Sequence, residues 1–158
     1  MTENVRLIAR QLSHPQRMHD YLMHSVNRCQ QILPVSNWQT LSYEEHEMLA
    51  AFRVRFSEFQ EHLGKTMRAV AIEENVDVDR FGSVLAFMEK MRILESAERW
   101  KLIREIHNAI NHEYEEDALR LSAFFAAMIE AAPELFSSHA KLVVFCKDVY
   151  KIVPEGLA

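Results

Sequence analysis

A long apolar repeat in the first half of the chain constrains the fold more than any other feature. Apolar residues recur at steps of three or four from Leu49 to Val70, which places them on one stripe of an α-helix. Ser42 stands before the repeat and Glu45 follows three residues later, the pattern of a capping box. The sequence therefore predicts a helix that begins at Ser42 and runs to about Asn75, with its apolar stripe packed against other helices.

Gly64 lies inside this expected helix. A glycine at such a position costs about 1 kcal/mol relative to alanine. Two explanations stay open at this point: a neighbouring helix approaches closely at Gly64, or the helix bends there.

The rest of the chain is also predicted to be helical, because three glycines and four prolines in 158 residues are too few for a fold built on tight turns. Ser13 is a candidate cap, Pro34 a stop, and Pro133 the start of the last helix. The other expected helices cover residues 15–33, 79–92, 96–112 and 115–131, and residues 3–12 are compatible with a further short helix. We therefore expect one domain, residues 1–158, with an all-α fold: an up-and-down bundle of five or six helices.

Composition excludes several classes of protein. The formal net charge of −5 argues against broad electrostatic capture of nucleic acid. The two cysteines, Cys29 and Cys146, have no CxxC spacing, and free thiols in a reducing cytosol are expected. No stretch has the roughly 20 apolar residues of a membrane span, and the first residues do not read as a signal peptide. The expectation is a cytoplasmic protein without a membrane segment.

Polar residues gather in one segment, from Trp100 to Tyr114. Projected at about 100° per residue, its apolar side chains share one arc and its polar ones the opposite arc. The apolar arc holds Leu102, Ile103, Ile106, Ala109 and Ile110, and the polar arc holds Arg104, His107, Asn108, Asn111 and His112. Trp100 projects onto the polar side, which suggests that a partner covers that face.

Two histidines, an arginine and two asparagines are the residue types that a site for a phosphodiester would use. Histidine exchanges protons near neutral pH, and a cation with amide donors stabilises charge on phosphate oxygens. A solvated polar face that leads into the acidic first turn of the next helix explains the same pattern. Taken alone, the segment leaves both interpretations open.

The stretch from Phe81 to Tyr114 resembles the HEPN family of small helical bundles, especially members encoded beside a minimal nucleotidyltransferase. The family motif is an Arg, a polar residue, a His four to six residues after the Arg and, in the toxin subgroup, a Tyr two positions beyond the His. Asn108, His112 and Tyr114 match it, whereas His107 occupies the position of the motif Arg.

The resemblance implies a HEPN-type component of a two-gene toxin–antitoxin or defence module. Active members are metal-independent endoribonucleases whose site lies between two protomers. Carried over, His112 would be the acid/base, Asn108 its polar support and Tyr114 the residue that a partner nucleotidyltransferase modifies. Arg104 or a protonated His107 would supply the missing cation. Homodimerisation, a nucleotidyltransferase partner and RNA are therefore expected, without cofactor or metal.

The alternative is a non-catalytic subunit that binds substrate for, or docks, a minimal nucleotidyltransferase. Such a subunit would not need the motif Arg. A structural or regulatory bundle is a third class, since one fold serves active and inactive members.

The remaining histidines do not suggest a metal site. His14, His19 and His24 recur at steps of five, which turns each about 140° from the last and prevents them from ligating one ion on a straight helix. No pair of histidines has the spacing of three or four residues that a helical zinc site needs. We expect His14, His19 and His24 on the surface.

Overall fold

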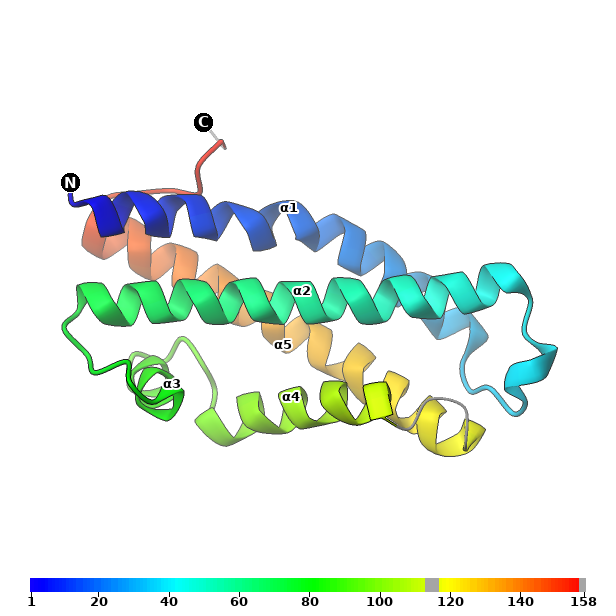
Figure 1. Ribbon diagram of the computed structural model, residues 1–158. Helices are drawn as coiled ribbons and strands as arrows, with labels where there is room; N and C mark the ends of the chain where they lie inside the picture. The colour runs from blue at the N-terminus through cyan, green and yellow to red at the C-terminus, as the bar shows by residue number, and fades with distance from the viewer. Residues whose placement is uncertain (113–116, 157–158) are drawn as a thin grey trace.

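The computed structural model describes residues 1–112 and 117–156, without the side chains of residues 110–112. Within this part of the chain the structure is all-α and has no strand (Figure 1). The five α-helices are α1 (Glu3–Ile32), α2 (Tyr43–Glu73), α3 (Phe81–Lys90), α4 (Ala97–His112) and α5 (Ala118–Tyr150), and a 3₁₀ turn, η1, covers Trp38–Thr40. The predicted fold class is confirmed.

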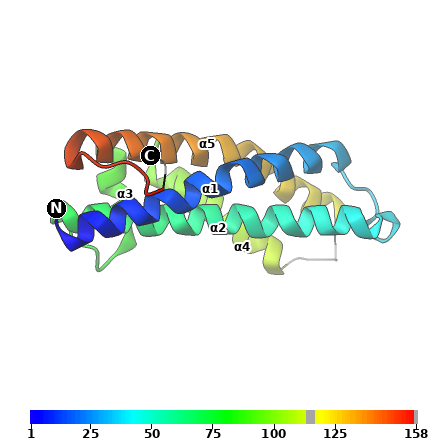
Figure 2. The same ribbon diagram turned by 90° about the horizontal axis from the view of Figure 1, so that it is seen from above.

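The three long helices form the body of the molecule. α1 and α2 pack along much of their length, and α1 also packs on α5 (Figure 2). α3 and α4 are shorter and lie on the side of α2 that faces away from α1, where α4 packs on α5 (Figure 1). α2 is therefore covered from two sides, and α4 forms one edge of the bundle. In the part of the chain that is described, no helix is long and apolar enough to cross a membrane.

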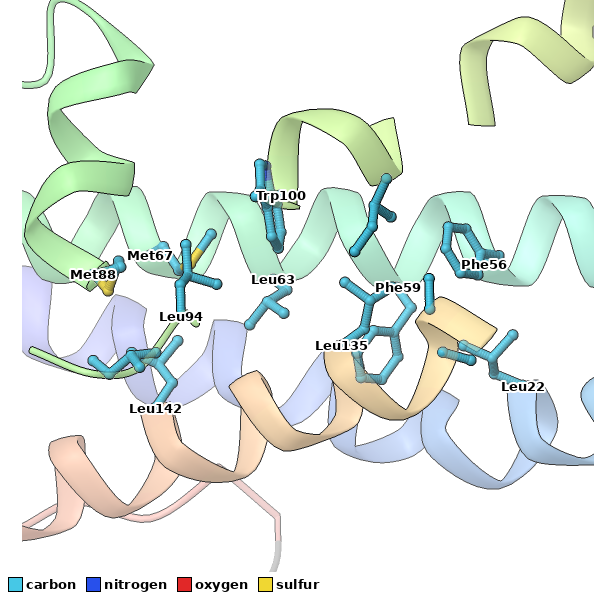
Figure 3. Packing of buried hydrophobic residues seen from close by; sticks show 14 of the residues in the cluster. Leu22, Phe56, Phe59, Leu63, Met67, Met88, Leu94, Trp100, Leu135 and Leu142 are labelled. Atoms are coloured by element: carbon cyan, nitrogen blue, oxygen red, sulfur yellow. The ribbon is translucent and has the colours of Figure 1, made fainter. Parts of the chain in front are cut away.

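The predicted start of α2 is confirmed. The Ser42 hydroxyl accepts a hydrogen bond from the Glu45 backbone N–H at 3.1 Å, and the Glu45 carboxylate accepts one from the Ser42 N–H at 3.0 Å. The apolar stripe that follows is buried. Its phenylalanines lie at the centre of the core together with leucines and methionines of the other helices (Figure 3).

The predicted break between residues 12 and 15 is wrong, because α1 continues through Pro15 as one helix. Thr2, not Ser13, caps this helix by accepting from the Val5 N–H at 3.0 Å. The Ser13 hydroxyl donates to the Arg10 carbonyl within the helix. A proline inside a helix costs about 3 kcal/mol, and the buried apolar residues on both sides of Pro15 outweigh it.

The predicted start of a last helix near Pro133 is also wrong, since α5 runs without a break from Ala118 to Tyr150. Asp117 caps it and accepts from the backbone N–H groups of Leu119 and Arg120, at 3.1 Å each. Pro133 lies on the exposed side of α5. As at Pro15, buried apolar residues on both sides of the proline outweigh the cost of the lost hydrogen bond.

Candidate functional site on helix α4

The first turn of α4 is anchored to its neighbours by side-chain hydrogen bonds. The Ser96 hydroxyl accepts from the Arg99 N–H at 2.9 Å, and the Glu89 carboxylate, on α3, accepts from the Ala97 N–H at 3.0 Å. The Arg99 guanidinium donates to both carboxylate oxygens of Glu134 on α5, at 3.1 and 2.9 Å. These bonds fix the rotation of α4 about its axis.

Trp100 is only 4% exposed, and its own chain covers it. Its indole lies over Gly64 of α2: a Cβ built on Gly64 would be 3.5 Å from Trp100 Cζ2 and 3.6 Å from Phe81 Cζ. Figure 3 shows the ring directed toward α2, close to Leu63. The rings of Trp100 and Phe81 thus pack over Gly64, but at distances that leave room for a methyl group, so this approach does not by itself require a glycine. The inference that a partner covers Trp100 is corrected, so this residue no longer argues for a dimer.

Burial of Trp100 turns α4 away from the predicted orientation. Trp100 and Ile103 are buried and His107 is half-buried, whereas Leu102, placed on the apolar arc, is 45% exposed. The largest side chain determined the buried side, because it carries the most apolar surface.

His107 lies on the inner side of α4, against α2. Its ring centroid is 6.5 Å from that of Phe56, and its Nδ1 atom is buried without a hydrogen-bond partner. Burial lowers the pKa of His107, the positive charges of Arg104 and Arg53 lower it further, and Glu61 opposes them. Burial therefore favours the neutral imidazole over the imidazolium. A neutral ring can accept a proton but supplies no permanent positive charge.

Arg104 and Asn108 lie one turn apart on α4, and both side chains are exposed. His107 is the neighbour of Asn108 in sequence but is turned toward α2. The structure thus keeps Arg104 and Asn108 on one open side with His107 at its inner edge. His112 is the last residue of α4, and its side chain lies outside the described part of the structure, as does all of Tyr114.

Three residues of α2 belong to this site and were missed from sequence. Gln60 is 1% exposed, and its Nε2 donates to the Trp100 carbonyl oxygen at 3.5 Å. Arg53 and Glu61 act on the charge of His107. The available signal was Gln60, a polar residue one turn after Phe56 beside an otherwise apolar stripe.

The site has no metal-binding character in its described residues, because no group of three or more His, Cys, Asp or Glu side chains lies within reach of one ion. What it offers is an exposed guanidinium, an exposed amide and a neutral imidazole. Comparisons of the chain with protein-family models, curated proteins and solved structures found no match.

Proposed function

We propose that the chain is the HEPN-type component of a two-gene toxin–antitoxin or defence module, and that its α4 face acts on RNA as a metal-independent endoribonuclease. One observation carries most weight: Arg104 and Asn108 are exposed on adjacent turns beside the half-buried imidazole of His107, whose pKa is lowered by burial. This places a permanent cation, an amide donor and a proton acceptor on one turn and a half of helix. The resemblance of residues 81–114 to the HEPN motif supports the same reading.

In this proposal, the ribose 2′-hydroxyl of RNA attacks the adjacent phosphate, and the 5′-oxygen of the next nucleotide leaves. His112 would act as acid/base, as the resemblance implies. The exposed guanidinium of Arg104 would donate to the phosphate oxygens, since a guanidinium is always charged and can donate two parallel hydrogen bonds. Asn108, one turn further on, would add an amide donor. His107, with its lowered pKa, suits proton transfer better than charge stabilisation.

Cleavage of a labelled RNA by the purified protein tests this proposal. His112→Ala and Arg104→Ala should each reduce the rate at least a hundredfold, a loss typical for removing a group that acts in the transition state. Lys147→Ala is the control, because Lys147 is also an exposed cation but lies on α5 and not on α4. A chelator should leave the rate unchanged. Intact RNA after prolonged incubation with the folded wild-type protein would refute the ribonuclease.

The neutrality of His107 favours a second candidate, a non-catalytic subunit that binds substrate for, or docks, a minimal nucleotidyltransferase. The motif places a permanent cation where His107 stands, and a half-buried imidazole with lowered pKa does not replace it. Co-purification with the nucleotidyltransferase encoded beside it, together with failure of His107→Arg to bring about RNA cleavage, would support this candidate. Tyr114 would be the residue to inspect for nucleotide modification in such a complex. Cleavage that appears on His107→Arg would instead support a ribonuclease ancestry.

A further inference from the structure

Three buried polar atoms without a hydrogen-bond partner lie at the interface of α2 and α4. They are Gln60 Oε1, Trp100 Nε1 and His107 Nδ1, and only Gln11 Oε1 and Trp38 Nε1 share this condition elsewhere in the described side chains. Buried polar groups in folded proteins nearly always have partners, so a cluster of exceptions marks a place where the partners are each other or a ligand. This cluster coincides with the candidate site.

Gln60 lies between Trp100 and His107 along this interface. Trp100 covers Gly64, one turn after Gln60, and His107 contacts Phe56, one turn before it. Gln60 itself reaches the Trp100 backbone carbonyl. The Gln60 amide is therefore in the part of α2 that faces the stretch of α4 between the two rings.

The orientation of the Gln60 amide follows from its one hydrogen bond. Nε2 donates to the Trp100 carbonyl oxygen at 3.5 Å, and the flipped amide would set two oxygens against each other. Oε1 must then be the free end, which is an acceptor in need of a donor. Two donors are available at the interface, the Trp100 indole N–H and, when it carries the proton, His107 Nδ1.

A neutral imidazole carries its proton on one nitrogen, and the hydrogen bond made there selects the tautomer. In His107 the buried nitrogen is Nδ1. A proton on Nδ1 needs an acceptor inside the interface, and Gln60 Oε1 is the unpartnered acceptor of that region. The other nitrogen, Nε2, then keeps its lone pair.

We propose that Gln60 is a positioning residue for His107: its Oε1 accepts a hydrogen bond from Nδ1–H, formed by rotation of the two side chains, and leaves Nε2 as the proton acceptor of the site. This is the arrangement by which enzymes orient a histidine base through a third group. The use of Nε2 on RNA rests on the proposed function, whereas the hydrogen bond does not. Arg104, Arg53 and Glu61 are the charged groups that act on the same ring.

Nitrogen-15 NMR of the chain with labelled histidine tests the hydrogen bond directly. In the wild-type protein at pH 7.5, His107 should be the Nδ1–H tautomer. Gln60→Met, which removes the acceptor at similar volume, should convert it to a mixture of tautomers. Gln60→Glu should keep the Nδ1–H tautomer and raise the measured pKa of His107 by about one unit or more, because a carboxylate favours the imidazolium.

Gln11→Met on α1 is the matched control, since Gln11 also has a buried and unpartnered Oε1. It should leave the His107 signals unchanged. A wild-type His107 with its proton on Nε2 would overturn the proposal, even if the Gln60 variants failed to fold. The proposal would also be overturned if Gln60→Met shifted only the NMR signal of the Trp100 indole N–H, because Trp100 would then be the partner of Gln60 Oε1. If His107 has the expected tautomer but the protein cleaves no RNA, the positioning role of Gln60 stands and the proposed ribonuclease activity is refuted.

Discussion

Replacing Gly64 by alanine should stabilise the protein, although Gly64 is buried under two aromatic rings. The added Cβ would meet Trp100 Cζ2 at 3.5 Å and Phe81 Cζ at 3.6 Å, and both are ordinary van der Waals distances. Gly64 lies inside α2, where alanine is favoured over glycine by about 1 kcal/mol. Because the methyl group fits without movement, we expect most of that difference to appear as free energy of unfolding.

Urea denaturation followed by circular dichroism measures this change. A gain of about 1 kcal/mol in a chain of this size corresponds to a rise in Tm of about 2–4 °C. Gly64→Val should do the opposite and lose about 1–3 kcal/mol, because its γ-methyl groups extend beyond the space under Trp100. Gly82→Ala is the matched control: nothing lies within 4 Å of a Cβ there, and Gly82 is near the start of α3.

The opposite ranking of the Gly64 variants would refute the reasoning. If Gly64→Ala lost stability, then α4 would pack on α2 more closely than the 3.5 Å contact to Trp100 indicates. If Gly64→Val were tolerated as well as alanine, then Trp100 would not be seated over Gly64. The tryptophan fluorescence of each variant distinguishes these outcomes, because displacement of the buried indole into water shifts its emission.

Three further predictions concern stability. Ser42→Ala should lower the free energy of unfolding by about 1 kcal/mol in urea denaturation, because it removes the cap of α2. Arg99→Gln should cost about 0.5–1 kcal/mol, and less in high salt, since the two-contact pair with Glu134 is partly exposed. His139 is buried with Nε2 3.1 Å from the Leu12 carbonyl oxygen, and burial lowers its pKa in the folded state. The unfolded chain therefore binds the proton more readily, and stability should fall as pH drops below about 6.5, by up to about 1.4 kcal/mol per pH unit, with a shallower slope in His139→Gln.

Local signals explain why α2 was predicted well. Its start depends on two side chains, Ser42 and Glu45, three residues apart, and its buried side on a regular stripe. The helix boundaries predicted at the two prolines were wrong for the opposite reason. Their effect on a helix is local, but the packing that overrides it comes from other helices, which sequence spacing does not reveal. Pro15 and Pro133 therefore lie within α1 and α5 rather than at helix ends.

The candidate site was likewise predicted only in part from the sequence. Arg104 and Asn108 are neighbours on one helix, so their common face followed from the helical period alone. The inward rotation of His107 could not be predicted in this way, because it depends on the packing of Trp100 over Gly64. These two residues are 36 positions apart in the sequence. Gln60 was missed because its partner, the Trp100 carbonyl, is 40 positions away.

Gln60 has consequences for both stability and chemistry. An apolar residue at this position would extend the buried stripe of α2, whereas the amide leaves an oxygen whose desolvation costs about 1–3 kcal/mol when it has no partner. A hydrogen bond from His107 removes that cost and at the same time fixes which imidazole nitrogen stays free. The placement of Gln60 in the interface that also holds the half-buried His107 is therefore easier to explain by the chemistry of the α4 face than by the packing of α2.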